Sequence, residues 1–192
     1  GASDDFVVES KETDEYIIQT MEVGEVRLDL YRENENFSEI ATGFFEQDFD
    51  AAAQTGFYLW DGCIELLHQL KDGLGEVVKG ARVVELGSGT GLGGLVASAM
   101  GAHVMLTDLP TVVNDITKKN IMENTSVFAG GQGLASAVEW QQPWAGSRAV
   151  AKGTVVAGAL DWFKPVEDQI CTNDPRTAKF IVCTECVWLL EL

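Results

Sequence analysis

Polar and apolar residues alternate in the first part of this chain. Residues 16–32 carry two alternating runs, separated by residues 21–24, and such alternation is typical of strands that bury one face. The pattern therefore predicts an N-terminal β-hairpin or meander. Residues 1–15 are acidic and weakly patterned, which favours a mobile arm with a short strand at 6–8. Residues 33–53 are expected to form a loop.

Helical spacing begins in the sequence TGFYLWDGCIELLHQLKDG, residues 55–73. Its apolar residues recur at the spacing of one helical face. These are Leu59, Cys63, Leu66, Leu67 and Leu70. Gly73 and Gly75 are expected to end the helix.

From residue 81 onward, short apolar runs alternate with helical patterns. Alternation of this kind implies a parallel, doubly wound α/β sheet. Residues 125–153 are rich in Gly, Ala and Ser and show no clear period. Strands are predicted at 81–86, 103–108, 154–162 and 180–185, and helices at 90–100, from 110 to about 124, and from 187 onward.

The chain is strongly acidic, with a formal net charge of -17 over 192 residues. Such a surface repels phosphate backbones, so a nucleic-acid partner is disfavoured. A basic, Lys-bearing protein segment would be attracted, although solubility alone also explains the acidity. No apolar stretch has transmembrane length and no signal-peptide pattern opens the chain. We therefore expect a single-domain protein of the cytoplasm, or alternatively the nucleus, with reduced thiols.

The strongest motif is the glycine turn in VVELGSGTGLGG, residues 83–94. A predicted strand leads into the turn and a predicted helix follows it. A ligand can therefore approach the backbone closely, and the helix N-terminus offers free N–H groups. Gly87, Gly89 and Gly91 exceed what a plain turn requires. Gly89, Gly91 and Gly94 also satisfy GxGxxG, a weak fingerprint of dinucleotide sites.

Two carboxylates bear on the choice of ligand. Asp108 ends the second predicted strand, where a carboxylate accepts both ribose hydroxyls of an adenosine in either kind of site. Glu85 lies where a dinucleotide site is normally apolar, because a carboxylate there would repel the pyrophosphate. The cationic amino-acid end of S-adenosylmethionine would instead be attracted. Glu85 therefore favours S-adenosylmethionine over NAD.

Several strings resemble the seven-β-strand protein-lysine methyltransferases of the methyltransferase-like 21 type. The resemblance covers roughly residues 55–192, and it implies a Rossmann-like class I methyltransferase sheet. It also implies S-adenosylmethionine as the cofactor and a lysine side chain of a protein as the methyl acceptor. The strings are TGFYLWDGCI at 55–64, ELGSGTGLGG at 85–94, TDLP at 107–110, NIMEN at 120–124, LDW at 160–162 and TECVW at 184–188.

The resemblance also divides the chain. Residues 1–54 become an acidic arm and β extension, and residues 55–192 the cofactor-binding domain. The family continues with three more strands beyond Leu192, so the sheet is expected to be truncated after its fourth core strand. Such a sheet would leave an apolar edge that favours dimerisation.

Site residues are assigned by the same resemblance. The expected cofactor contacts are Trp60 beside the methionine part, Gly87, Ser88 and Gly89 through their backbone, Glu85 near the ammonium, Asp108 at the ribose, Trp162 over the adenine, and Thr184 near the methyl group. Glu185 and Trp188 are expected to face the substrate as the catalytic residues. They replace the family's Asp and Tyr, and Trp188 keeps an aromatic wall for a lysine ammonium without the phenol hydroxyl. No metal is expected.

Plainer interpretations stay open beside these assignments. Core packing also explains Trp60, and strand-end anchoring also explains Trp162. For the whole chain, the alternatives are an NAD-dependent oxidoreductase and a catalytically silent cofactor-binding or interaction module.

Two further motifs are interpreted as structural. Cys183 and Cys186 form a CxxC pair without the second pair that a zinc site needs, so buried packing is favoured. Asn120 and Asn124 are interpreted as a helix-end cap and a surface amide. Trp140 and Trp144 are expected to pack in the core or in a loop.

Overall fold

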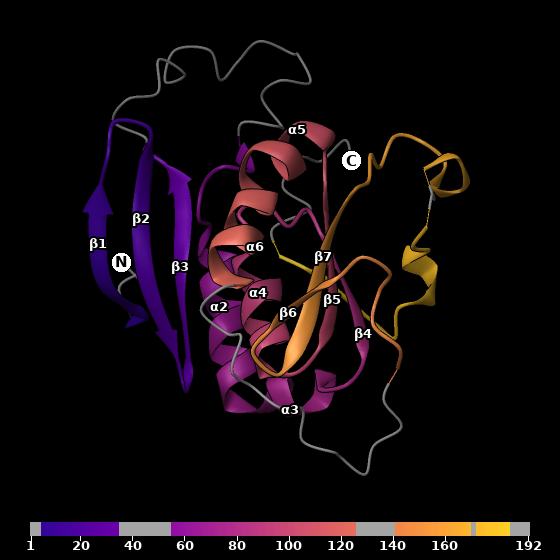
Figure 1. Ribbon diagram of the computed structural model, residues 1–192, viewed down its shortest axis with the longest axis horizontal. Helices are drawn as coiled ribbons and strands as arrows, with labels where there is room; N and C mark the ends of the chain where they lie inside the picture. The colour runs from indigo at the N-terminus through magenta and orange to yellow at the C-terminus, as the bar shows by residue number, and fades with distance from the viewer. Residues whose placement is uncertain (1–4, 35–54, 126–140, 170–171, 185–192) are drawn as a thin grey trace.

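The computed structural model describes residues 5–34, 55–125, 141–169 and 172–184 of the chain. They form three layers, in which helices lie between an N-terminal sheet and a larger sheet (Figure 1). Strands and helices alternate through the larger sheet, so the expected Rossmann-like α/β fold is confirmed.

The N-terminal sheet is antiparallel, with strand order β1-β2-β3. The predicted hairpin is formed by β2 (Tyr16–Val23) and β3 (Val26–Glu33). A strand is present near the expected 6–8, but it is longer: β1 (Val7–Glu12) pairs with β2 as a third strand, and the expectation of a mobile arm is wrong for the rest of it. Most of β1 is exposed on both faces, and its sequence therefore lacks the alternation that marks a half-buried strand.

The larger sheet has the strand order β6-β7-β5-β4-β8. The four predicted strands are parallel to one another, and β6, which falls in the region without a clear period, runs antiparallel to β7. Because β5 and β8 lie on opposite sides of β4, the carboxyl ends around β4 form a topological switch point, the usual ligand site of such sheets. The strands are β4 (Arg82–Leu86), β5 (His103–Asp108), β6 (Arg148–Val150), β7 (Gly153–Ala159) and β8 (Phe180–Cys183).

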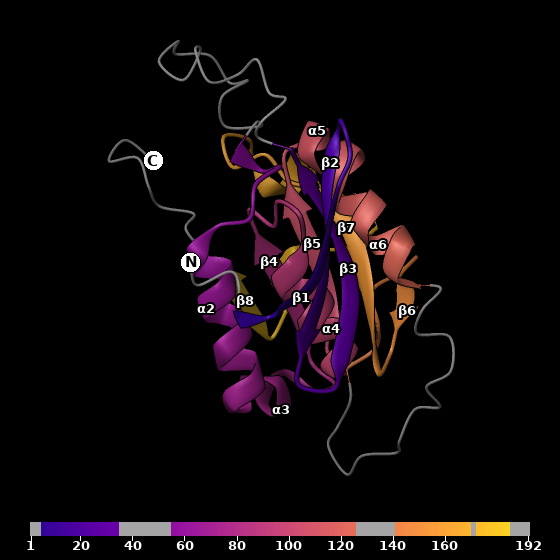
Figure 2. The same ribbon diagram turned by 90° about the vertical axis from the view of Figure 1, so that its left-hand side faces the viewer.

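Three helical segments make up the middle layer (Figure 1), and Figure 2 shows them behind the N-terminal sheet. The first is α2 (Asp61–Gln69), followed by the π-helical η3 (Leu70–Leu74) and α3 (Gly75–Val78). The second is α4 (Leu92–Met100), and the third is α5 (Pro110–Val112), the π-helical η4 (Val113–Thr117) and α6 (Lys118–Thr125). Two single 3-10 turns, η5 (Val166–Asp168) and η6 (Pro175–Thr177), lie between β7 and β8.

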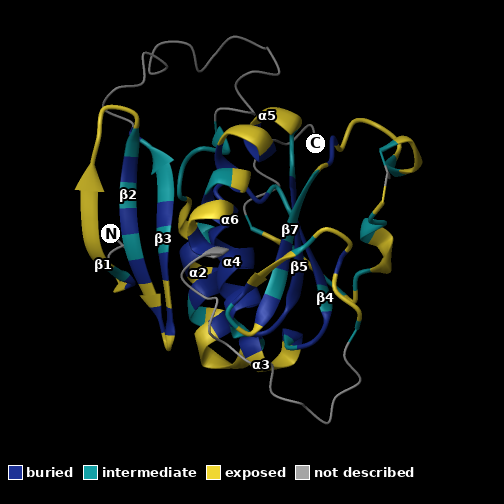
Figure 3. Cartoon of the chain, in the orientation of Figure 1, coloured by how far each residue is buried: buried dark blue, intermediate teal, exposed yellow. Residues whose placement is uncertain are grey.

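Helix α4 is buried on every side and appears dark blue in Figure 3. Apolar residues at helical spacing, among them Leu95 and Val96, lie on one face of this helix. The residues Ala97 and Ser98, outside that face, are just as buried, with 5% and 0% of their surface exposed. A helix that is buried all round must be covered from both sides, and here the two sheets provide that cover (Figure 1).

The opposite face of the larger sheet is packed against the segment around Trp144. The Trp144 side chain is 2% exposed, contacts Val84 and Met105, and donates from its Nε1 to the His103 carbonyl over 2.8 Å. The prediction that Trp144 packs in the core is confirmed, whereas Trp140 lies outside the described residues.

Two structural interpretations of the sequence are wrong. Asn120 and Asn124 are neither a cap nor a surface amide, because both are 0% exposed and bond to the backbone of β3. Cys183 is disulfide-bonded rather than a reduced, buried thiol, and it is one of the exposed residues of β8. Cys63 forms no disulfide, as expected.

Candidate ligand site at the carboxyl edge of the sheet

The carboxyl ends of the parallel strands carry most of the residues that the sequence singled out. β4 leads into the glycine loop, residues 87–91, and β5 ends at Asp108. Trp162 follows β7, and Thr184, which is half-buried, follows β8 directly. Since neighbouring parallel strands end at the same edge, the structure brings these positions to one side of the sheet. Glu185 and Trp188 lie outside the described residues, and their roles stay predictions.

Asp108 joins the glycine loop to two strands. Its Oδ2 accepts from the Gly89 N–H over 2.8 Å, and its Oδ1 accepts from the Leu109 N–H over 2.7 Å. Its backbone carbonyl accepts from the Leu160 N–H, just beyond β7. Burial raises the pKa of Asp108, while the two N–H donors oppose that rise. A carboxylate has about four acceptor positions, so Asp108 keeps capacity for further donors such as a pair of hydroxyls.

Ser88 lies in the glycine loop with a buried and unpaired hydroxyl. The residue is 8% exposed, and its backbone N–H donates to the Thr107 carbonyl over 3.0 Å. Within the described part of the chain, its Oγ has no hydrogen-bond partner. Buried hydroxyls in folded proteins nearly always have partners. An orphaned hydroxyl beside a glycine loop therefore fits a ligand that bonds there.

Gly89 shows why the loop needs glycine. Its φ is +51°, and an added Cβ would lie 2.8 Å from the Gly56 carbonyl oxygen. The segment before α2 therefore packs directly on the loop. Trp60 caps α2 at the end of that segment, is 44% exposed, and donates from its Nε1 to the Thr55 carbonyl. An indole held at this position and open to solvent is not core packing.

Glu85 points into the protein rather than towards solvent. It is 2% exposed, and its Oε2 accepts from the Gly94 N–H in the first turn of α4 over 2.9 Å. Burial raises the pKa of Glu85 to about 8, against the opposing effect of the Gly94 donor. The carboxyl is therefore largely protonated at neutral pH, which weakens the sequence argument that its charge repels a pyrophosphate. Its contact with a cofactor ammonium stays a prediction.

Trp162 is presented on an ordered turn after β7. The turn is held by Asp161, whose Oδ1 accepts from the Phe163 N–H and whose Oδ2 pairs with Lys164 at 2.8 Å. Gln169 bonds to both the N–H and the carbonyl of Asp161. Trp162 itself is 45% exposed, so its ring is not an anchor buried at the strand end and is available to cover a ligand.

Sequence reasoning missed a buried polar stripe on the third helical segment. Thr117, Asn120 and Asn124 are all 0% exposed and hydrogen-bonded to backbone groups outside their helix. Their spacing of three and four residues was the available signal, because it places them on one helical face. It was overlooked because polar residues on a helix are usually solvated.

Two kinds of feature are absent from the described ranges. No group of three or more His, Cys, Asp or Glu side chains is arranged to hold a metal ion there. In the same ranges, no helix combines the length and the apolar character needed to cross a membrane.

Comparison with known proteins identifies relatives of the chain. A family model described as lysine methyltransferase matches residues 45–151. The chain is 33% identical to EEF1A lysine methyltransferase 3 of Xenopus tropicalis over 106 residues, which are 55% of this chain and 46% of that protein. It is 34% identical to calmodulin-lysine N-methyltransferase of Arabidopsis thaliana over 110 residues, 56% of this chain and 34% of that protein.

A third relative shows a shorter but closer match. The chain is 43% identical to protein N-lysine methyltransferase METTL21A of Danio rerio over 67 residues, 34% of this chain and 29% of that protein. The matched part of the chain thus spans less than half the length of each of these relatives.

Proposed function

The chain belongs to the lysine methyltransferase family, and from that premise we propose that it binds S-adenosylmethionine and transfers its methyl group to a lysine of a protein substrate. The observation that carries this proposal is the meeting of Asp108 with the glycine loop, through the 2.8 Å bond from the Gly89 N–H. That bond unites the two parts of the site that an adenosine-containing cofactor requires.

The residues at this edge fit the cofactor. Asp108 retains acceptor capacity for the ribose hydroxyls, and the orphaned Ser88 hydroxyl and the loop backbone would hold the amino-acid end. Trp60 and Trp162 are both partly exposed aromatic side chains at this edge, and we assign them to the methionine part and the adenine. Thr184, at the end of β8, is assigned to the region of the methyl group.

When bound, S-adenosylmethionine supplies an electrophilic methyl group on a sulfonium, and the protein's task is to align the acceptor nitrogen with it. A lysine must be neutral to attack. A carboxylate at Glu185 favours the charged ammonium and cannot by itself lower that pKa. We therefore assign Glu185 to orienting the amine and accepting its proton, and Trp188 to excluding water, which favours the neutral form.

A protein substrate agrees with the charge of the chain. The formal net charge of -17 attracts a basic, lysine-bearing segment. The names of two relatives refer to calmodulin and EEF1A as methylated proteins, which makes those two proteins reasonable first substrates to test.

A label-transfer assay tests the proposal. The chain is incubated with methyl-labelled S-adenosylmethionine and with calmodulin or EEF1A, and the labelled residue is located by mass spectrometry. We expect label on lysine, its loss with Asp108→Ala, and its retention with Asp115→Ala, which changes an exposed aspartate on η4. Label on another residue type, or cofactor binding without any transfer to protein, would contradict the proposal.

A further inference from the structure

The buried stripe of Thr117, Asn120 and Asn124 lies between the N-terminal sheet and the ligand site. All three side chains are 0% exposed, although all three are polar. Buried polar groups are tolerated only when they are hydrogen-bonded, so their partners reveal what the stripe holds together.

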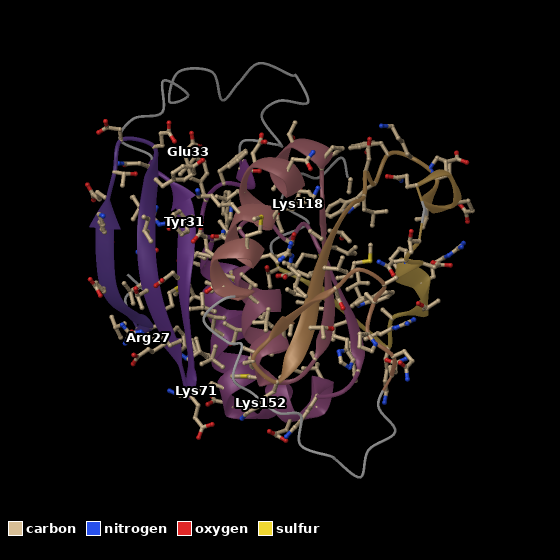
Figure 4. All side chains as sticks on the ribbon, viewed as in Figure 1. Arg27, Tyr31, Glu33, Lys71, Lys118 and Lys152 are labelled. Carbon is tan, nitrogen blue, oxygen red and sulfur yellow. The ribbon has the colours of Figure 1, made fainter. Side chains whose placement is uncertain are left out.

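Two asparagines of the stripe bond to the edge of β3 as a neighbouring strand would. The Asn124 amide accepts from the Asp29 N–H over 2.9 Å and donates to the Asp29 carbonyl over 2.8 Å. Asn120 does the same with Tyr31, at 2.8 and 2.9 Å. Figure 4 shows Tyr31 on β3 and Lys118 on the adjacent helical segment. The pairing covers the free edge of β3.

The other end of the stripe reaches the glycine loop. The Asn120 Nδ2 also donates to the Thr90 carbonyl over 2.9 Å, and the Thr117 hydroxyl donates to the Gly89 carbonyl over 2.7 Å. Gly89 is the residue whose N–H binds Asp108. One helical face therefore donates hydrogen bonds to two successive carbonyls of the loop.

Asn120 is the member of the stripe that bonds to both the N-terminal sheet and the glycine loop. Its amide bonds to Tyr31 on β3 and to Thr90 in the loop at the same time. We infer that Asn120 is a positioning residue, through which the N-terminal sheet holds the glycine loop in the shape that binds the cofactor. This inference rests on the proposed cofactor binding. It assigns the β extension a function in the site.

Asn124 provides a matched control. Each amide makes three side-chain hydrogen bonds, and each residue is 0% exposed. Both bond to one residue of β3, but only Asn120 bonds to the loop. Asn120→Ala and Asn124→Ala should therefore cost similar stability and differ in what they do to the ligand site.

The test measures the affinity for S-adenosylhomocysteine by calorimetry, below the melting temperature of both variants. We expect Asn120→Ala to weaken binding about tenfold, because a buried loop carbonyl loses its donor, and Asn124→Ala to leave it nearly unchanged. Equal weakening by the two variants would overturn the inference. Absence of binding by the unaltered chain would instead overturn the proposed function.

Hydrogen exchange supplies two further readouts. Without ligand, the Gly89 and Gly91 amides should exchange faster in Asn120→Ala than in Asn124→Ala. In the unaltered chain, S-adenosylhomocysteine should slow exchange of the Tyr31 amide more than that of the Asp29 amide, because coupling between two sites is reciprocal. Equal exchange in the first comparison would contradict the role of Asn120. Equal slowing in the second would contradict it as well, and this comparison needs no variant, so it holds even if Asn120→Ala fails to fold.

Discussion

The Glu85 carboxyl accepts a hydrogen bond from the Gly94 N–H over 2.9 Å, and so joins the end of β4 to the first turn of α4. This contact gives one of the unpaired N–H groups at the helix start a partner. It also places an ionisable group directly after the buried residues Val83 and Val84. The start of α4, directly after the glycine loop, therefore depends on a buried carboxyl.

Gly94 is required by this close contact. A Cβ at Gly94 would lie 2.3 Å from Leu106 Cδ2 and 2.7 Å from Glu85 Oε2. We expect Gly94→Ala to lower the free energy of unfolding by about 1–3 kcal/mol through overpacking. Val77→Ala, on an exposed helical residue, should have little effect in the same urea denaturation experiment. A Gly94→Ala variant as stable as the unaltered chain would show that the packing there is looser than the structure indicates.

The raised pKa of Glu85 makes stability depend on pH. Burial moves this pKa from 4.5 to about 8, so the folded state holds a proton that the unfolded state has lost between those values. Stability is then fully present below the unfolded pKa and falls as pH rises towards the folded one. Over pH 5–8, Glu85 should contribute a loss on the order of 3 kcal/mol.

Glu85→Gln isolates that contribution. The amide has nearly the same volume, keeps an acceptor for the Gly94 N–H and does not titrate in this range. Denaturation measured at several pH values should show the variant gaining stability relative to the unaltered chain as pH rises. A constant difference from pH 5 to 9 would mean that Glu85 does not titrate in that window.

The sequence predicts the parallel strands more closely than it predicts the buried asparagines of the third helical segment. The parallel strands were predicted closely, as 103–108 for β5 (His103–Asp108) shows, because buried strands and their glycine turns are marked by local pattern. The roles of Asn120 and Asn124 were not predicted. A sequence pattern compares a residue with its neighbours along the chain, whereas these side chains are buried by β3, about ninety residues away.

The same limit explains α4 and β1. Helix α4 has apolar and small residues on all sides, with Ser98 as its one polar residue, and the cover of both sheets makes every side internal. Strand β1 is polar and exposed, and it exists because β2 pairs with it. Tertiary partners thus decided how far α4 is buried, and they made β1 a strand against its local pattern.

Two neighbouring aromatic residues test the adenine assignment. Trp162 and Phe163 are 45% and 69% exposed on the same turn, but only Trp162 is assigned to the adenine. Loss of base stacking costs about 1–3 kcal/mol, so Trp162→Ala should weaken S-adenosylhomocysteine binding by about 5- to 150-fold. Phe163→Ala should not change it. Comparable losses from the two substitutions would remove the assignment.

Glu185 is expected to act on the substrate and not on the cofactor. Glu185→Ala should reduce turnover by about a hundredfold, the lower range for loss of a general base, with little change in S-adenosylhomocysteine affinity. Glu167→Ala, on an exposed residue of η5, should change neither. Steady-state kinetics and calorimetry on the same preparations measure both quantities. A parallel loss of affinity and turnover would show that the assigned role is wrong.

The glycine loop and Asp108 are proposed to form an S-adenosylmethionine site. Titration calorimetry of the chain with S-adenosylhomocysteine, and separately with NAD, tests it most directly. We predict saturable binding of S-adenosylhomocysteine that Asp108→Ala abolishes while the variant stays folded, and no binding of NAD. Binding of NAD alone, or binding of S-adenosylhomocysteine that is unaffected by Asp108→Ala, would contradict the claim.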